Sequence, residues 1–256
     1  MKRTPRSPGS RRLALFAAFV LLAVTSASAA AADDGPGPFG VTVAAAVSAQ
    51  SVRVGALFEA ARAPSRLAGG HFCTASVVHS PHRNLILTAA HCLDDRGSLV
   101  FVPGYRDGRA PYGVWRLGRR FLPDGWAKGQ HEDSDVAFAA VEDNRGRRIE
   151  DVVGGNRFAS GVATGATGVT VTGYPNSRET PIVCTDKPTA RGTTQQRIAC
   201  PGFSGGTSGS PWRNGDGQVV GVLGGHDEGG VTADVSYSVV FGAEAAELYR
   251  DAAADP

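Results

Sequence analysis

The chain has 256 residues, of which 42% are hydrophobic and 20% are charged, with 34 glycines, 15 prolines and four cysteines. This length allows one domain built of two halves, or two small domains, with ample material for a buried core. Basic residues number 26 and acidic residues 24, and this balance excludes a highly charged disordered chain.

Residues 1–29 have the pattern of a secretory signal peptide. Five basic residues precede position 13, an apolar run follows at 13–24, and Ala-Ser-Ala at 27–29 supplies small residues for cleavage. A transmembrane anchor is the alternative, but twelve apolar residues are too few to cross about 30 Å of hydrocarbon. We therefore expect a secreted, extracellular protein that does not associate with membranes once the signal has been removed.

Removal of residues 1–29 changes the charge balance, because it removes five of the 26 basic residues and none of the 24 acidic ones. The remaining chain has 21 basic and 24 acidic residues, a formal net charge of −3. This charge does not support the basic surface that nucleic acid or an anionic membrane would require. We expect no nucleic-acid partner, and we expect a monomer.

The four cysteines indicate two disulfides, because an exported chain meets an oxidising environment. Four cysteines allow three pairings, and spacing alone does not choose among them. Metal binding is the competing use, but the chain has no Cys-x-x-Cys pair, and its His-x-x-His at 79–82 lies in a turn sequence. We expect no metal and no other cofactor.

Taken in chain order, the mature sequence begins with an Ala/Gly/Pro-rich segment at 30–51 that has no strand or helix period. We interpret it as a leader or propeptide. From residue 52 onward, short Val-rich runs alternate with turn residues, which predicts strands. The predicted strands are 54–58, 73–79, 85–89, 98–102, 114–117, 136–141, 168–173, 181–184, 218–223 and 236–240, and a helix is predicted at 242–252.

This pattern favours an all-β domain at 52–250, because no alternation of strands and helices indicates a parallel sheet. A Gly-, Asn- and Arg-rich stretch at 144–156 is the best internal boundary. It divides the domain into a first half at about 52–150 and a second half at about 151–240.

Three motifs place a histidine, an aspartate and a serine in an informative order. His91 follows an apolar strand in Leu-Ile-Leu-Thr-Ala-Ala-His-Cys at 85–92, and Asp135 immediately precedes another apolar run. Ser208 lies among glycines in Gly-Gly-Thr-Ser-Gly-Ser-Pro at 205–211. Each motif alone is more often a core histidine, a turn-forming aspartate or a flexible loop. Together they follow the chain order of one of the known catalytic triads.

The chemistry of such a triad explains why these residue types are needed. A serine hydroxyl is a weak nucleophile until a base accepts its proton, and His91 can accept that proton and return it to the leaving group. Asp135 would hold the imidazole in the required tautomer. Glycines around Ser208 would let the backbone N–H groups of Gly206 and Ser208 converge on the oxyanion, each contributing about 3 kcal/mol.

These motifs resemble those of the chymotrypsin/trypsin-like serine peptidases, and the resemblance covers residues 52–250. The matching strings are Phe-Cys at 72–73, Ser-Val-Val at 76–78, Thr-Ala-Ala-His-Cys at 88–92, Asp-Val-Ala at 135–137 and Gly-Thr-Ser-Gly-Ser-Pro at 206–211. The resemblance implies two antiparallel six-stranded β-barrels with a short C-terminal helix. It places His91 and Asp135 on the first barrel and Ser208 on the second.

The resemblance also implies function and cysteine pairing. A chain with this triad would hydrolyse polypeptide substrates through an acyl-enzyme. Its disulfides would join Cys73 to Cys92, beside the histidine, and Cys184 to Cys200, in the second barrel.

The sequence departs from the animal digestive members of that family. Thr207 replaces the aspartate that pairs with a newly formed N-terminal amine, so we expect this activation switch to be absent. The strings at 172–175 and 206–211 are closer to secreted bacterial members, including the glutamyl endopeptidase branch.

The predicted substrate pocket consists of Gly202, Phe203, Leu223, Gly224 and Gly225. Phe203 and Leu223 replace the hydroxyl residue and the histidine with which the glutamyl branch binds an acidic side chain. Gly202 replaces the pocket aspartate of the trypsins. We expect a neutral or apolar preference, because a buried substrate carboxylate without a partner is costly.

His226 follows directly after the last predicted pocket residue, Gly225. It is either a surface residue or a group that restores the binding of an acidic substrate side chain.

Two other functions compete with this interpretation. Gly-Phe-Ser-Gly-Gly at 202–206 fits the nucleophile elbow of α/β-hydrolases, with Ser204 as its serine. That fold needs parallel strands and a histidine after the serine and the acid, and only His226 follows Ser204. The second alternative is a secreted binding module that has the peptidase fold but does not use the triad.

Overall fold

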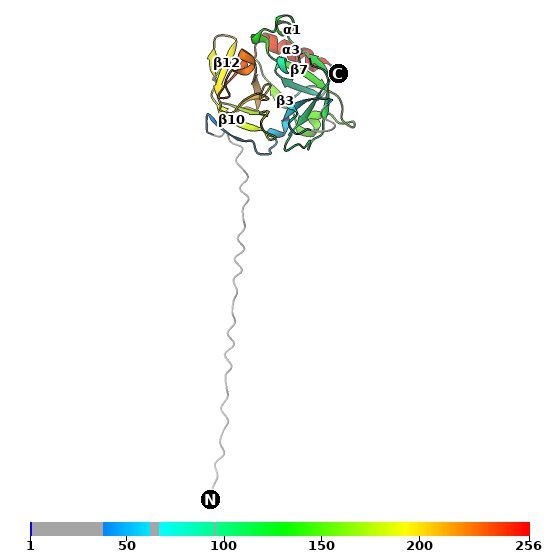
Figure 1. Cartoon of the computed structure of the whole chain (residues 1–256), viewed down its shortest axis with the longest axis vertical. Helices are drawn as coiled ribbons and strands as arrows, with labels where there is room; N and C mark the ends of the chain where they lie inside the picture. Colours follow the sequence, from blue (N-terminus) through cyan, green and yellow to red (C-terminus); the bar gives the residue numbers. More distant parts are fainter. Residues whose placement is uncertain (2–37, 62–66, 95) are drawn as a thin grey trace. The chain divides into compact units, whose positions relative to one another are not determined.

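The computed structural model of the chain describes residues 1, 38–61, 67–94 and 96–256. The predicted signal peptide lies outside the described residues apart from Met1, and so does the first part of the predicted leader. The described residues from 38 onward belong to one unit (Figure 1). No helix among the residues described is both long and apolar enough to span a membrane.

Six strands of the first half form a closed antiparallel barrel in the order β2-β3-β4-β7-β6-β5. They are β2 (Val54–Glu59), β3 (His71–Val78), β4 (Leu85–Thr88), β5 (Leu99–Pro103), β6 (Trp115–Phe121) and β7 (Ala137–Val141). Each lies within a few residues of a predicted strand. Their apolar side chains fill the barrel, and the buried cluster includes Leu57, Val77, Ile86, Phe101 and Trp115.

The barrel closes where β2 pairs with β5, and Gly55 makes this closure possible. A Cβ atom at position 55 would lie 2.7 Å from the Cα of Pro103 and against the carbonyl of Val102. Only glycine permits so close an approach of two backbones.

The second half consists of two sheets. The first has the order β1-β10-β9-β13-β14-β8, and the second has the order β11-β12-β15. Their strands are β1 (Val41–Ala44), β8 (Arg157–Phe158), β9 (Val169–Gly173), β10 (Ile182–Asp186), β11 (Thr189–Arg191), β12 (Gln195–Ala199), β13 (Pro211–Asn214), β14 (Gln218–Val222) and β15 (Val235–Val239).

The predicted second closed barrel is not confirmed. The two sheets meet at β14 and β15, where the Val222 N–H donates to Ser238 Oγ at 2.9 Å and the Gly224 N–H donates to the Tyr237 carbonyl at 3.0 Å. These bonds bridge the sheets without a continuous backbone ladder. In addition, β8 pairs parallel to β14, whereas all strands were predicted to be antiparallel.

Strand β1 lies in the predicted leader, where the sequence shows no strand period. It pairs antiparallel with β10, with Val41 opposite Thr185. Three of its four residues are exposed, so it has no alternation of buried and exposed positions for a sequence pattern to reveal. Its strand conformation comes from the partner strand. The interpretation of 30–51 as a leader stays a prediction.

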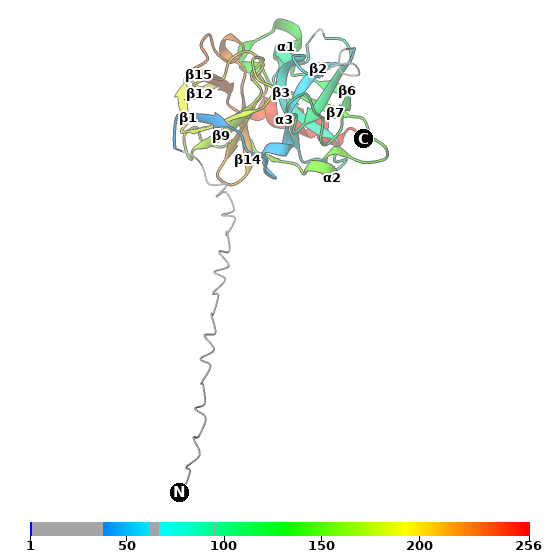
Figure 2. The ribbon, with the colours of Figure 1, turned by 60° about the horizontal axis from the view of Figure 1, so that its bottom comes forward.

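The predicted C-terminal helix is confirmed as α3 (Ala243–Ala254). An apolar cluster packs this helix against both halves of the molecule. The cluster contains Leu85 and Phe138 from the barrel, Val219 and Val222 from β14, and Leu248 from α3. Figure 2 shows α3, in red, beside β7. The short helices α1 (Asp124–Gly129) and α2 (Ile149–Val153) were not predicted. Because this cluster packs both halves together, residues from both can form one site.

Candidate active site

His91 lies in a short helical turn, η2 (Ala90–Cys92), which Ala89 separates from the end of β4. Ala89 and Ala90 are fully buried, so the small side chains before the histidine let the turn pack into the barrel. A disulfide joins Cys92 to Cys73 in β3, nineteen residues earlier in the chain. The turn is therefore attached to two strands, while the His91 side chain keeps 11% of its surface exposed.

Asp135 is fully buried and directly follows the turn η3 (Glu132–Ser134). Its Oδ2 accepts hydrogen bonds from His91 Nδ1 at 2.8 Å and from the Gly225 N–H at 2.7 Å. Its Oδ1 accepts the His91 backbone N–H at 3.0 Å. Three donors thus compensate the burial of the carboxylate. With Asp135 as its acceptor, a neutral imidazole carries its proton on Nδ1, and its Nε2 lone pair can then act as a base.

The loop that carries Ser208 is bonded to both halves of the molecule. The Ser208 carbonyl accepts the Thr74 N–H at 2.7 Å, and the Thr74 hydroxyl donates to the Gly206 carbonyl at 2.9 Å. On the other side, the Gly209 N–H donates to the Leu223 carbonyl at 2.7 Å.

These bonds bring the three predicted triad residues to the same region. Thr74 adjoins Cys73, whose disulfide holds the turn of His91, and Leu223 is two residues before Gly225, which contacts Asp135. Within the described residues, Ser208 Oγ makes no hydrogen bond to His91. In substrate-free sites this bond is often long and tightens when substrate binds.

Gly206 has a backbone conformation that requires glycine, with φ at +96°. A Cβ atom there would lie 2.6 Å from the Tyr174 carbonyl oxygen and 2.7 Å from the Asn176 nitrogen. In the part of the chain that the structure describes, the N–H groups of Gly206 and Ser208 have no protein acceptor. Both are therefore available to a ligand.

The predicted pocket residues have different environments. Phe203 and Leu223 are 4% and 3% exposed and pack with Trp212 in the apolar core of the second half. Gly224 and Gly225 lie against Asp135, and a Cβ atom on Gly224 would be 2.7 Å from its Oδ2. Gly202 is exposed. The substrate pocket itself stays a prediction.

Both ring nitrogens of His226 already have protein partners. Its Nδ1 lies 3.2 Å from Glu132 Oε2, and its Nε2 lies 2.9 Å from Asp227 Oδ2. This pairing favours a surface role over the binding of an acidic substrate side chain.

Sequence reasoning did not identify Thr74 or Trp126 as neighbours of the site. The indole of Trp126, in α1, has its ring centroid 6.3 Å from that of His91, and its Nε1–H donates to Asp94 at 3.1 Å. Neither residue stands in a recognisable motif, so only the fold reveals its position.

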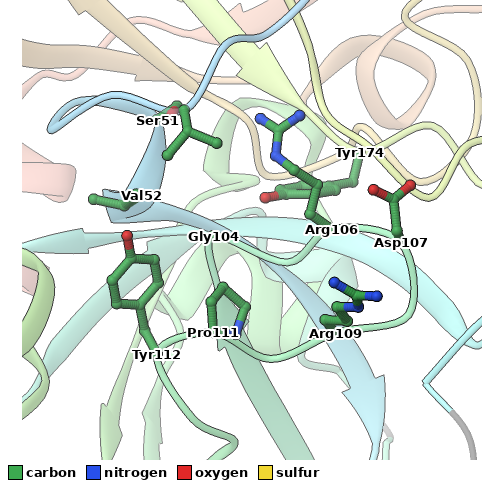
Figure 3. A pocket seen from close by; sticks show the side chains of 10 residues that line it. Ser51, Val52, Gly104, Arg106, Asp107, Arg109, Pro111, Tyr112 and Tyr174 are labelled. Carbon is green, nitrogen blue, oxygen red and sulfur yellow. The ribbon is translucent and has the colours of Figure 1, made fainter.

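A separate pocket of about 220 Å³ lies where residues 47–52 meet the loop around 104–112 (Figure 3). Arg106 and Arg109 line it together with Tyr112 and the ring of Tyr174. It contains none of the predicted site residues.

The model of the trypsin-like peptidase domain matches residues 73–222 of the chain. No curated protein matches the sequence. Among solved structures, the protease Anisep from Arthrobacter nicotinovorans is 26% identical, with 84% of this chain and 100% of that chain covered and a TM-score of 0.72. The thermostable serine protease AL20 from an extremophilic microorganism is 27% identical, with 82% and 100% covered and a TM-score of 0.70.

A Glu endopeptidase is 20% identical, with 86% of this chain and 99% of that chain covered and a TM-score of 0.66, a likeness of fold alone. The family match spans more than half of the 256 residues, including the positions of the histidine, the aspartate and the serine. The chain therefore belongs to the trypsin-like peptidases.

Proposed function

We propose that the chain is a secreted serine endopeptidase that hydrolyses peptide bonds through an acyl-enzyme. Ser208 is the nucleophile, His91 is the general base and acid, and Asp135 orients His91. The buried carboxylate of Asp135, which accepts both the ring and the backbone N–H of His91, is the observation that carries this proposal. In the neutral imidazole this arrangement places the proton on Nδ1, so that Nε2 can accept a proton.

The reaction follows from these roles. As Ser208 Oγ attacks the peptide carbonyl carbon, its proton moves to His91 Nε2, and the N–H groups of Gly206 and Ser208 donate to the oxyanion. The imidazolium then gives its proton to the amide nitrogen, the C–N bond breaks, and the acyl-enzyme remains. Water attacks the ester while His91 accepts one of its protons, and His91 then gives that proton to Ser208 Oγ as the ester C–O bond breaks and the carboxylic acid leaves, to ionise in solvent.

Secretion forms part of the proposal. The disulfides Cys73–Cys92 and Cys184–Cys200 support an oxidising compartment, as does the signal pattern at 1–29. The partners are polypeptide substrates, which a monomer can bind without a cofactor.

A fluorophosphonate probe, which labels activated serines covalently, tests the nucleophile. We expect labelling and peptide hydrolysis by the purified mature protein, and loss of both in Ser208→Ala. The matched control is Ser204→Ala, which changes an exposed serine in the same loop and should retain both.

Three results would contradict the proposal. Labelling of Ser208→Ala, with loss in Ser204→Ala, would favour the nucleophile elbow. An unlabelled wild type, with a known serine peptidase labelled in parallel, would favour the binding module. Labelling without any peptide hydrolysis would exclude endopeptidase activity.

A further inference from the structure

Polar contacts connect the turn before Asp135 with the segment that follows Gly225. Glu132 Oε1 accepts the Asp227 N–H at 3.0 Å, and Glu132 Oε2 lies 3.2 Å from His226 Nδ1. His226 Nε2 in turn lies 2.9 Å from Asp227 Oδ2. We call these three residues, Glu132, His226 and Asp227, the Glu132 clamp. It joins the first barrel to the second half.

Gln195 adds a second connection between the same two segments. Its side-chain amide donates to the Glu132 carbonyl at 3.1 Å and to Asp133 Oδ1 at 2.8 Å, and its Oε1 accepts the His226 N–H at 3.4 Å. Gln195 is 6% exposed, and these bonds are partly buried. The turn before Asp135 is therefore held at several points by groups of the second half.

The clamp includes a backbone conformation that needs support. Asp227 and Glu228 have φ angles of 48° and 54°, and two consecutive left-handed residues that are not glycine are rare. Such conformations persist where the surrounding structure holds them. The bond from the Asp227 N–H to Glu132 holds this turn from the other half, as does the contact between His226 and Glu132.

The clamp and the catalytic carboxylate share the same two chain segments. Glu132 is three residues before Asp135, and His226 directly follows Gly225, whose N–H donates to Asp135 at 2.7 Å. A shift of the 225–227 segment would therefore move a donor away from Asp135. That change would alter the carboxylate's hydrogen bond with His91.

The Glu132 clamp contributes little to the stability of the fold, but it can determine the position of the 225–227 turn. The side chains of Glu132 and Asp227 are 51% and 43% exposed, and ion pairs at such sites stabilise proteins weakly. The hydrogen bond from the Asp227 N–H lowers the pKa of Glu132 below its ordinary value. His226 lowers this pKa further, and burial opposes both effects. Glu132 thus stays ionised to lower pH than an ordinary glutamate, and its hydrogen bonds with the Asp227 N–H and His226 lose the assistance of its charge as the pH falls through that lowered pKa.

We propose that Glu132 is a positioning residue for the peptidase reaction: by holding the 225–227 turn, it places the Gly225 N–H on Asp135 and so orients His91. This inference rests on the proposed function. It predicts that loss of the Glu132 carboxylate slows the chemical step although Glu132 takes part in no proton transfer.

The test compares Glu132→Ala with Glu150→Ala. Glu150 is a matched control, because its carboxylate also pairs with a histidine, His79, at 2.7 Å and also accepts a backbone N–H, that of Ser80. We expect Glu132→Ala to lower kcat about tenfold, within the roughly hundredfold loss that misplacement of catalytic groups causes. We expect KM to change less than kcat, and Glu150→Ala to change neither.

Two further measurements separate positioning from general damage. Glu132→Gln keeps an acceptor for the Asp227 N–H, so it should recover most of the lost kcat. The second measurement is the low-field proton NMR resonance of the hydrogen bond from His91 to Asp135. Its chemical shift should change in Glu132→Ala and stay at the wild-type value in Glu132→Gln and in Glu150→Ala.

An unchanged kcat and resonance in Glu132→Ala would overturn the inference, as would equal losses in both alanine variants. An inactive wild type whose resonance shifts only in Glu132→Ala would refute the proposed function and leave the positioning role supported. The two failures are therefore distinguishable.

Discussion

Asp135 is the residue on which the geometry of the site most depends. It is fully buried, and its carboxylate accepts both N–H groups of His91 that face it, together with the N–H of Gly225. A carboxylate has no donor of its own, so it can accept all of these bonds at once. A neutral amide of the same shape cannot, because one of its two ends donates.

Asp135→Asn is therefore expected to retain the fold but to lose turnover. The amide NH₂ would face an N–H donor, or the His91 ring would take the other tautomer, and kcat should fall about 10⁴-fold. Steady-state hydrolysis of a peptide substrate measures this. Asp124→Asn, at an exposed ion pair with Lys128, should leave kcat unchanged. A kcat for Asp135→Asn close to that of the wild type would exclude the orienting role.

Among the elements, β3 supports the site from two sides. Cys73 bonds to Cys92, beside His91, while the next residue, Thr74, holds the backbone of the Ser208 loop. One strand thus aligns His91, the proposed base, with the loop of Ser208, the proposed nucleophile. Within the described residues, the disulfide of the second half, between Cys184 and Cys200, adjoins neither His91 nor a residue that bonds the Ser208 loop.

The two disulfides provide a matched comparison. Their cysteines are 19 and 16 residues apart, so the chain-entropy model assigns each about 3 kcal/mol of stability. The double variant Cys73→Ala with Cys92→Ala and the double variant Cys184→Ala with Cys200→Ala should lose similar free energies of unfolding in urea. Only the first pair should also lower kcat markedly at a temperature where both variants are folded. Equal effects on kcat would refute the aligning role of β3.

At the scale of the whole molecule, the apolar cluster between the halves holds together the two parts that contribute residues to the candidate active site. Phe138 of β7 is fully buried, and its ring centroid lies 5.6 Å from that of Phe158 and 5.7 Å from that of Tyr249 in α3. One side chain therefore links the barrel, the second half and the C-terminal helix. Its contacts keep residues from both halves together at the active site.

Phe138→Ala should destabilise both halves together. We expect a loss of about 3–5 kcal/mol, as for other buried phenylalanines. Near- and far-ultraviolet circular dichroism should show one coincident unfolding transition. Phe39→Ala removes a ring that is 58% exposed, so its effect should stay within about 0.5 kcal/mol. Separate transitions for the two halves in Phe138→Ala would show that the cluster does not couple them.

Sequence patterns predicted the elements in which buried residues alternate with exposed ones or follow one another in an unbroken run. The strands of the barrel and the helix α3 have such patterns, and each was predicted within a few residues. The strand β12, Gln-Gln-Arg-Ile-Ala, was not predicted, because three of its five residues are polar. It becomes a strand by pairing with β11 and β15, and no local pattern records such partners.

Sequence alone determined the cysteine count and the residue types and order of the proposed triad, because short motifs carry that chemistry. Only the tertiary structure decided that Gly225 donates to Asp135, ninety residues away, and that Glu132 holds the turn at Asp227. It also decided that Phe203 and Leu223 pack into a core. The physical reason is that these contacts form where two packed halves meet, and local periodicity reports only whether a residue is buried, not which distant residue covers it.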